Sequence, residues 1–326
     1  MEIGIIGYRG HSLKLLRISL KQMSVKKIII FCRSKNKSDE LNYKNSNKKI
    51  KYTYDFNDLI NSRAVIVSSS NESHVSYIKK LLNEDLYIFC EKPACTNIKD
   101  YNFLSKLKKS DKSRIYFNYN FKKSQLNTDI KKILSYKKFG KPVHVTIESS
   151  QGIAFKDWFR NNWRSSKDIF KNVSGNLGVH YINLLEGYFG KPKKIFVKIN
   201  SISGNQSNDT GIVNIHFNNN ISATLVLTYA APYSQQIKFL LSNSIISYKD
   251  NTLAIYYPRD TFSKDGLFIH PKKVKMFKYK KNFSELSQEE SLKYFFNNVN
   301  KKKFFSVKDF DSAISTSKSM LDARYI

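Results

Sequence analysis

Short apolar runs alternate with amphipathic segments over the first 120 residues. Residues 27–32 (KIIIFC) and 86–90 (LYIFC) are continuous apolar runs, which are typical of parallel strands buried on both faces. Leu13, Leu16 and Leu20 fall on one face of a helix predicted over 11–23. Six strands are predicted in all, at residues 2–6, 27–32, 50–54, 64–68, 86–90 and 114–118. This alternation predicts a doubly wound α/β domain built on a parallel sheet.

The pattern changes after residue 120. Strands with alternating or mixed patterning now follow one another with few helices between them, which favours a large, mostly antiparallel sheet with helices on one face. We therefore expect an N-terminal Rossmann-type parallel sheet and a C-terminal α+β domain. The predicted boundaries are 1–120 for a dinucleotide-binding domain and 121–326 for a domain of substrate binding and oligomerisation. Helices are predicted at 125–136, 178–188, 288–299 and 307–321.

The chain is strongly basic, with 56 Lys and Arg against 26 Asp and Glu, a net charge of +30. Only nine of the 56 are Arg, the preferred reader of phosphates and bases, and the Lys residues are spread along the whole chain. The abundance of Asn, Ile, Tyr and Phe suggests that an A+T-rich coding sequence contributes to the excess. We expect no specific nucleic-acid partner, although a positive field would attract an anionic cofactor or substrate.

The three cysteines, Cys32, Cys90 and Cys95, have no metal-ligand spacing and imply no disulfide framework. No apolar run approaches the ~18 residues of a membrane span, and the N-terminus has no basic segment followed by an apolar one. We expect a cytoplasmic protein with neither a metal site nor a membrane partner.

The turn after the first strand reads Gly4-Ile-Ile-Gly7-Tyr-Arg9-Gly10-His-Ser12. Of the three glycine positions of a dinucleotide-binding turn, only the first is matched, by Gly7, while Arg9 and Ser12 occupy the others. Backbone amides at a helix N-terminus still attract phosphate. Arg9 would either fold over a pyrophosphate as a charged lid or block its site.

The second strand ends in Phe31-Cys32-Arg33-Ser34-Lys35, without the carboxylate that would bind the ribose hydroxyls of NAD. Arg33 suits a 2′-phosphate, which it can contact with two parallel hydrogen bonds. The sequence therefore favours NADP(H), with NAD(H) as the alternative, and assigns Arg33 and Ser34 to the cofactor.

Several motifs occur in order along the chain. They are Glu91-Lys92-Pro93, Asn71 with His74, Phe117-Asn-Tyr-Asn120, Asn162-Trp163-Arg164, and Gly175-Asn176-Leu-Gly178-Val-His180-Tyr-Ile-Asn183. In this set the chain resembles the Gfo/Idh/MocA family, the glucose–fructose oxidoreductase and inositol dehydrogenase superfamily. The resemblance spans nearly the whole chain. It implies an NAD(P)-dependent oxidoreductase that transfers hydride between nicotinamide and a hydroxyl or keto carbon of a sugar.

The resemblance also assigns residues to roles. Lys92 and His180 would handle the proton, and Asn176 would position the substrate. The expected cofactor contacts are Gly7, Tyr8, Arg9, Gly10, His11, Arg33, Ser34, Ser69, Asn71, His74, Glu91, Trp163 and Arg164. The expected substrate contacts are Lys92, Asn120, Asn176, His180 and Tyr181. The imidazole of His11, like those of His144, His216 and His270, has no catalytic context and is expected to be structural.

Lys92 follows a buried strand, and a partly desolvated Lys beside a positively charged nicotinamide would have its pKa lowered toward neutrality. It could then take part in proton transfer. The motifs look most like those of relatives that act on nucleotide-activated sugars in surface-polysaccharide pathways. Relatives associate through the exposed face of the antiparallel sheet, so a homodimer or homotetramer is expected.

Three positions depart from the family pattern. The catalytic aspartate of the family corresponds to Asn176, a second aspartate corresponds to Asn183, and Arg9 stands at a glycine position. Asn can hold a hydroxyl or orient an imidazole, but it cannot take up a proton. The alternative interpretation is therefore a catalytically weakened homologue that binds a nucleotide or sugar as a sensor or partner protein.

Overall fold

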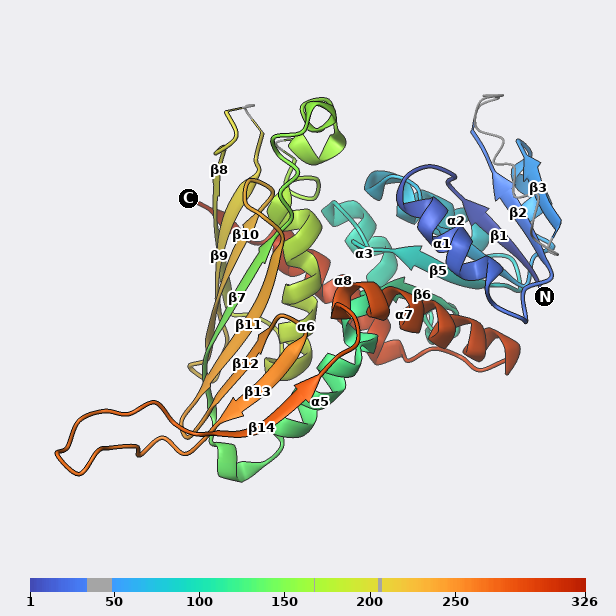
Figure 1. Cartoon of the computed structure of the whole chain (residues 1–326). Helices are drawn as coiled ribbons and strands as arrows, with labels where there is room; N and C mark the ends of the chain where they lie inside the picture. Colours follow the sequence, from blue (N-terminus) through green and yellow to red (C-terminus); the bar gives the residue numbers. More distant parts are fainter. Residues whose placement is uncertain (34–48, 167, 205–206) are drawn as a thin grey trace. The chain divides into compact units, whose positions relative to one another are not determined.

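The computed structural model describes residues 1–33, 49–166, 168–204 and 207–326, which form two compact units. Unit 1 contains Met1–Asn120 and Gln288–Ser317, and unit 2 contains Phe121–Ser287 and Lys318–Ile326. The expected division into 1–120 and 121–326 took the chain as two consecutive blocks. Most of the two closing helices instead groups with unit 1 (Figure 1).

Unit 1 contains a six-stranded parallel sheet in the order β3-β2-β1-β4-β5-β6. The chain builds outward from β1 to β3 and then returns to place β4 on the other side of β1. Open α/β sheets bind ligands at such a reversal, beside the carboxyl ends of the strands. The strands are β1 (Glu2–Ile6), β2 (Lys27–Phe31), β3 (Lys49–Thr53), β4 (Ala64–Val67), β5 (Tyr87–Glu91) and β6 (Ile115–Asn118).

The helices of this unit follow the expected crossovers. They are α1 (His11–Leu20), α2 (His74–Leu81), α3 (Ile98–Ser105), α4 (Lys109–Lys112), most of α7 (Phe283–Asn300) and most of α8 (Val307–Leu321). Leu292, Phe295, Phe296 and Val299 of α7 recur at helical spacing and are buried in one core with Ile3, Ile5 and Phe89 of the sheet. This apolar stripe explains why a C-terminal helix joins the N-terminal sheet.

The predicted parallel sheet is confirmed, with all six strands within two residues of their predicted limits. The helices α3 and α4 were not predicted. Leu104 is the one buried side chain of α3, and α4 buries none, so neither segment carries an apolar period. The sequence signal on which helix prediction rests is absent there.

Unit 2 contains a nine-stranded mixed sheet in the order β14-β13-β12-β11-β7-β10-β9-β8-β15. Its pairs are antiparallel except for β7 with β10 and β8 with β15, so the expectation of a mostly antiparallel sheet is confirmed. The strands are β7 (Pro142–Ser150), β8 (Lys194–Asn200), β9 (Thr210–His216), β10 (Ser222–Thr228), β11 (Ser234–Leu241), β12 (Ile245–Lys249), β13 (Thr252–Tyr256), β14 (Lys273–Lys278) and β15 (Arg324–Tyr325).

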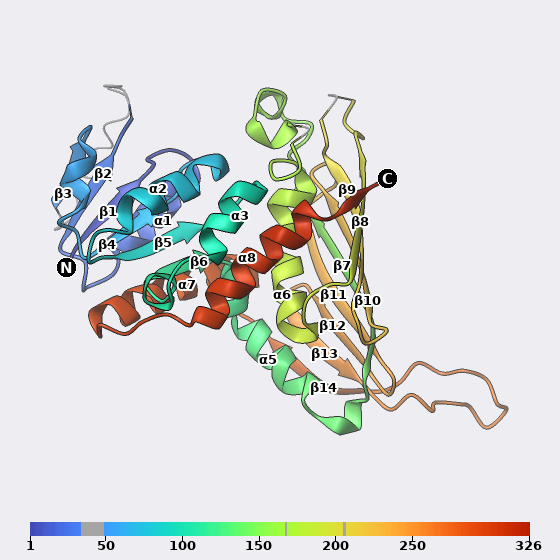
Figure 2. The same cartoon turned by 180° about the vertical axis from the view of Figure 1, so that it is seen from behind.

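Two helices, α5 (Gln125–Leu134) and α6 (Val179–Phe189), lie along one face of this sheet (Figures 1 and 2). Buried residues alternate with more exposed ones along β9 and β10, which places Val213, Ile215, Ala223 and Leu225 in the core. On the opposite face the alternate positions of these two strands are mostly polar, although Ile212 and Val226 are among them.

The chain enters α6 through a π-helical turn, η8 (Ser174–Gly178). A Cβ on Gly175 would lie 2.5 Å from the Cα of Phe170 and closer still to the carbonyl oxygen of Ile169. The glycine of this motif is therefore required by the close approach of two backbone segments.

The described part of the chain contains no helix long and apolar enough to cross a bilayer. Nor does that part contain a group of three or more His, Cys, Asp and Glu side chains that could hold a metal ion. Its cysteines are free thiols, all of them buried.

We predict that Gly175→Ala destabilises unit 2 by at least about 2 kcal/mol, because the added methyl group meets backbone that cannot move aside as a side chain can. Gly187→Ala is the matched control. It lies inside α6, where a Cβ meets its nearest atom, Lys122 Cε, at 3.6 Å, and alanine favours the helix. Urea unfolding of the two variants measures the difference. Equal stability of the two would contradict this explanation of the motif.

Candidate active site

The turn between β1 and α1 brings backbone close to the end of β4. Gly7 has a φ of +107°, and a Cβ there would lie 2.8 Å from Ser12 Oγ and 3.0 Å from the Ser68 carbonyl oxygen. Ser12 Oγ donates to that same carbonyl at 3.0 Å, which fixes the turn at the reversal of strand order. At the start of α1, Gly10 offers no side chain to cap the helix. The Ser12 and Leu13 N–H groups already donate to the Arg9 and Gly10 carbonyl oxygens, at 3.1 and 3.2 Å, so a bound phosphate would be attracted by the positive end of the helix dipole rather than by these two amides.

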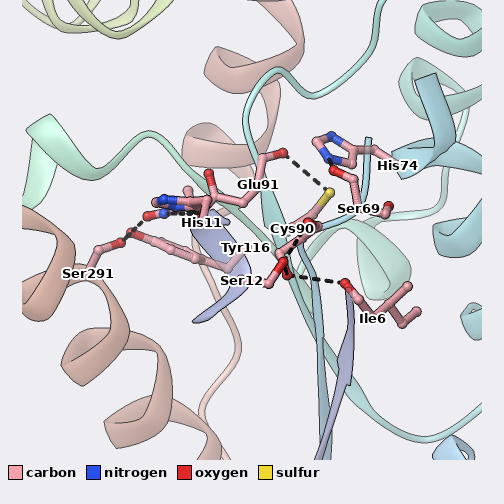
Figure 3. A network of polar contacts seen from close by, with 11 residues as sticks. Ile6, His11, Ser12, Ser69, His74, Cys90, Glu91, Tyr116 and Ser291 are labelled. Atoms are coloured by element: carbon pink, nitrogen blue, oxygen red, sulfur yellow. Dashed lines mark hydrogen bonds and ion pairs between the residues drawn. The ribbon is translucent and has the colours of Figure 1, made fainter. Parts of the chain in front are cut away.

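A buried polar network surrounds the carboxylate of Glu91 at the end of β5 (Figure 3). Glu91 Oε1 lies 3.1 Å from His11 Nε2 and accepts a hydrogen bond from Asn118 Nδ2 at 2.7 Å. Ser291 Oγ donates to Asn118 Oδ1 at 2.6 Å and lies 2.7 Å from the hydroxyl oxygen of Tyr116. The network thus joins the start of α1, the ends of β5 and β6, and helix α7.

Glu91 is ionised despite its burial. Burial acts to raise its pKa, but the charge and hydrogen bond of His11, the hydrogen bond from Asn118 and the charge of Lys92 together outweigh this effect. They hold the pKa at about 2, below the ordinary value of 4.5. A buried carboxylate of this kind is stable only while its partners replace the lost water.

Glu91 precedes Lys92 in the chain, and Pro93, which follows it, is held by His74. Its ring is fully buried, with Nδ1 at 3.0 Å from the Pro93 carbonyl oxygen and Nε2 at 3.2 Å from the Ser69 carbonyl oxygen. Burial lowers the pKa of His74, against the opposing effect of those hydrogen bonds and of the charge of Glu91. A neutral imidazole carries one N–H and donates to one carbonyl at a time.

Lys92 is half-buried between these two anchored residues, at the carboxyl edge of the sheet. The side chain of Glu91 before it is fixed by His11 and Asn118, and the carbonyl of Pro93 after it by His74. The motifs around Glu91 and His74 therefore fix the backbone that carries the lysine.

The structure places two residues whose roles the sequence predicted. His74, an expected cofactor contact, has a buried ring with both nitrogens directed at backbone carbonyls. His11, expected to contact the cofactor and to have a structural imidazole, pairs its ring with the carboxylate of Glu91 and remains partly exposed. Glu91 itself is an internal anchor, buried with its Oε1 already engaged by two partners.

The other predicted cofactor residues of unit 1 lie near the same edge. Arg9 is exposed, with Cζ 5.1 Å from the centroid of the Tyr8 ring. Arg33 is exposed just after β2, and Ser34 lies outside the described residues. Ser69 and Asn71 are half-buried between β4 and α2. Asn120, a predicted substrate contact, is buried where unit 1 ends.

The predicted residues of unit 2 gather around the start of α6. The His180 ring stacks on Phe121 with centroids 4.6 Å apart and is half-buried. Asn176 Nδ2 donates to the Tyr229 hydroxyl at 2.6 Å. Burial raises the pKa of Tyr229 to about 12, against the hydrogen bond from Asn176 and the charge of Arg164. Asn176 is therefore anchored by a tyrosine that stays protonated.

Tyr181 does not fit its expected contact with substrate. Its side chain is almost fully buried, its hydroxyl accepts a hydrogen bond from Gln235 Nε2 at 2.7 Å, and its ring packs edge-on to Phe121. Tyr181 belongs to the core because it lies on the sheet-facing side of α6.

An exposed Trp163 and a half-buried Arg164 form an aromatic and cationic pair in the short helix η7 (Trp163–Ser165). Arg164 Cζ lies 4.3 Å from the Trp163 ring centroid, and its backbone N–H donates to Asn162 Oδ1 at 3.1 Å. The asparagine of this motif caps the turn, and the pair presents a planar cation on an aromatic ring.

Sequence reasoning missed Asn118, Ser291 and Tyr116 as members of the site. The pairing of Ser291 with Asn118 spans 173 positions, and no local pattern indicates it. Asn118 carried one usable signal, since a polar residue at the end of a buried strand of a parallel sheet faces the ligand edge.

We predict that Glu91 makes stability depend on pH. Its folded pKa of about 2 is below the ordinary 4.5, so its contribution is fully present above pH 4.5 and is lost as the pH falls toward 2. At pH 3.5 the loss relative to pH 6 is about 1 to 1.5 kcal/mol. Urea unfolding at these two pH values measures the free energy of unfolding, and the difference between them should be smaller by this amount in Glu91→Gln. Glu148→Gln, at an exposed position of β7, is the control, and an unchanged pH dependence in Glu91→Gln would refute the assignment.

Several solved structures share the fold along the full length of the chain. The myo-inositol 2-dehydrogenase of Lactobacillus plantarum is 17% identical with a TM-score of 0.77, covering 99% of this chain and 97% of its own. KijD10, a 3-ketoreductase of Actinomadura kijaniata in complex with NADP and TDP-benzene, is 13% identical with a TM-score of 0.79, covering 100% of this chain and 98% of its own. The UDP-N-acetylglucosamine 3-dehydrogenase GnnA of Acidithiobacillus ferrooxidans is 12% identical with a TM-score of 0.73, covering 99% of this chain and 96% of its own.

The curated protein YteT of Bacillus subtilis is 23% identical over 133 residues, which is 40% of this chain and 31% of YteT. Two family models match successive parts of the chain. The model for the oxidoreductase family with an NAD-binding Rossmann fold matches residues 1–119, and that for the GFO/IDH/MocA C-terminal domain matches residues 128–248. The chain therefore belongs to the Gfo/Idh/MocA family of oxidoreductases.

Proposed function

We propose that this protein is an NADP(H)-preferring oxidoreductase that exchanges hydride with a hydroxyl or keto carbon of a sugar, most specifically a nucleotide-activated sugar. The observation that carries the proposal is the placement of Lys92. It lies at the carboxyl edge of a parallel sheet, fixed on one side by the Glu91 network and on the other by His74. Such rigid support is what a group that transfers a proton requires.

The residues of unit 1 fit a dinucleotide. The positive φ of Gly7 lets backbone approach closely, and a Cβ on Gly10 would meet no atom within 4 Å, so the turn is open at this point. The α1 N-terminus and Arg9 provide positive potential for a pyrophosphate. When bound, the nicotinamide would supply the hydride acceptor or donor.

The proposed proton transfer belongs to Lys92 and His180. In the oxidation direction a neutral Lys92 amine would gain the proton that the sugar hydroxyl loses, and in the reduction direction the Lys92 ammonium would return it. Asn176 would position a substrate hydroxyl. The structure supports this division because Asn176 is held by Tyr229 and has no group that ionises near neutral pH.

The substrate class rests on three supports. Structures similar to this chain include enzymes named for UDP-N-acetylglucosamine and for a 3-keto substrate, the latter with TDP-benzene bound. The net charge of +30 favours an anionic, phosphate-bearing substrate. The exposed ring of Trp163 and the half-buried cation of Arg164 suit a sugar or a phosphate.

We predict that Lys92→Ala lowers kcat by at least about 100-fold, because the proton must then leave without a positioned base. The Kd of NADPH should change by less than about threefold. Turnover is followed by nicotinamide absorbance with UDP-N-acetylglucosamine, a TDP-linked sugar and myo-inositol as probes. Lys99→Ala, an exposed lysine on α3, is the control. Wild-type kcat in a folded Lys92→Ala variant would remove this lysine from the mechanism.

We predict that Arg33→Ala weakens NADPH binding about 10- to 100-fold and leaves NADH binding nearly unchanged, because a charged hydrogen-bonding partner of the 2′-phosphate is lost. Calorimetric titration with each cofactor measures the ratio. An equal loss for both cofactors would mean that Arg33 does not contact the 2′-phosphate.

A further inference from the structure

A long arm, residues 258–272, connects β13 to β14 and projects beyond the end of the sheet of unit 2 (Figures 1 and 2). The outer part of the arm is a small hairpin. The Ser263 N–H donates to the Leu267 carbonyl at 2.9 Å, and the Ile269 N–H donates to the Thr261 carbonyl at 3.0 Å. A bridge between Phe262 and Phe268 lies between these two bonds. The outer part of the arm therefore forms a defined ribbon, while Arg259 at its base contacts Ser242 and Asn243 in the turn between β11 and β12.

The hairpin carries large apolar side chains on both of its faces. The rings of Phe262 and Phe268 form a cross-strand pair with centroids 5.2 Å apart, so they share one face. Leu267 and Ile269 are neighbours of Phe268 in the strand and so point to the opposite face. The exposed fractions are 53% for Phe262, 68% for Leu267, 90% for Phe268 and 51% for Ile269. An isolated two-stranded ribbon is marginal in water, and these faces need a cover.

Positive charge is concentrated on the arm and on the edge strand that follows it. Residues 258–281 contain eight Lys and Arg and two Asp, a net charge of 8 − 2 = +6 over 24 residues. That density, about 0.25 per residue, exceeds the 30/326, or about 0.09, of the whole chain. All eight basic side chains are exposed, and Val274 and Met276 lie exposed among them on β14.

We propose that this arm and β14 form a docking surface for an anionic lipid bilayer. Lipid headgroups would neutralise the lysines, while Phe262, Leu267, Phe268 and Ile269 enter the boundary between headgroups and acyl chains. Insertion into the bilayer would cover both apolar faces of the hairpin at once. Contact with a flat protein surface would cover only one of them. The sequence expectation of no membrane partner rested on the lack of a spanning segment, and peripheral docking needs none.

Charge and chemistry favour a bilayer over other occupants. A second copy of the chain that docked its own arm here would bring the same positive charge to the contact and be repelled by it. A nucleic acid would match the lysines but leave Leu267 and Ile269 in water, because its surface offers phosphates and base edges rather than an aliphatic phase. The bilayer surface offers both anions and hydrocarbon.

The test is sedimentation of the full chain with vesicles of phosphatidylcholine alone and of phosphatidylcholine with phosphatidylglycerol. We expect binding to the anionic vesicles at least tenfold stronger than to the neutral ones, and weaker as salt is raised. The triple variant K272Q/K273Q/K275Q should bind at least tenfold more weakly. The triple variant K131Q/K132Q/K137Q removes the same charge from exposed positions of α5 and the turn after it, and should change binding less than threefold.

The apolar contribution is tested with the double variant L267S/F268S, which should reduce vesicle binding about tenfold. The control is Met23→Ser. Met23 belongs to unit 1 and is 97% exposed, and its replacement should not change vesicle binding. Absence of binding to anionic vesicles would overturn the proposal. So would equal losses in the two lysine variants or wild-type binding by L267S/F268S. A change of oligomeric mass in L267S/F268S without vesicles would assign the arm to a second copy instead.

Discussion

The ionised carboxylate of Glu91 is the constraint on which the site of unit 1 depends. A buried charge is tolerated only where fixed partners replace water, and here His11 and Asn118 do so on a single oxygen atom. Ser291 and Tyr116 hold Asn118 in turn. His11 ties the start of α1 to this oxygen, and Asn118 ties β6 and, through Ser291, helix α7 to it. Loss of either partner leaves the buried charge less well compensated, so both contacts oppose movement of the carboxyl edge of the sheet.

Rigidity at this edge has a functional consequence, because Lys92 lies between Glu91 and the Pro93 carbonyl held by His74. The motif Glu91-Lys92-Pro93 thus holds the backbone on both sides of Lys92, the side chain that we propose to be reactive. Unit 2 departs from the family at Asn176, which Tyr229 anchors. We infer that the departure preserves a positioning role and shifts the proton chemistry toward Lys92 and His180.

The fold was largely predictable because buried parallel strands leave continuous apolar runs, as in 64–68 and 86–90, and alternation marks the second sheet. Helix α3 could not be predicted, because a helix that buries only Leu104 leaves no periodic pattern of apolar residues in the sequence. The lysine of the site could be found by resemblance. The pairing of His11 with Glu91 could not, because it joins residues 80 positions apart through the folding of the sheet. The burial of Tyr181 could not be predicted, because the motif does not show which side of α6 faces the core.

The measurement that tests the central claim most directly is calorimetric titration of the wild-type chain with NADPH and then with NADH, at low and moderate salt. We expect micromolar binding of NADPH and weaker binding of NADH. Failure of both cofactors to bind at millimolar concentration would contradict it. In that case Arg9 closes the turn, and the rigid edge around Glu91 supports something other than a dinucleotide-dependent reaction.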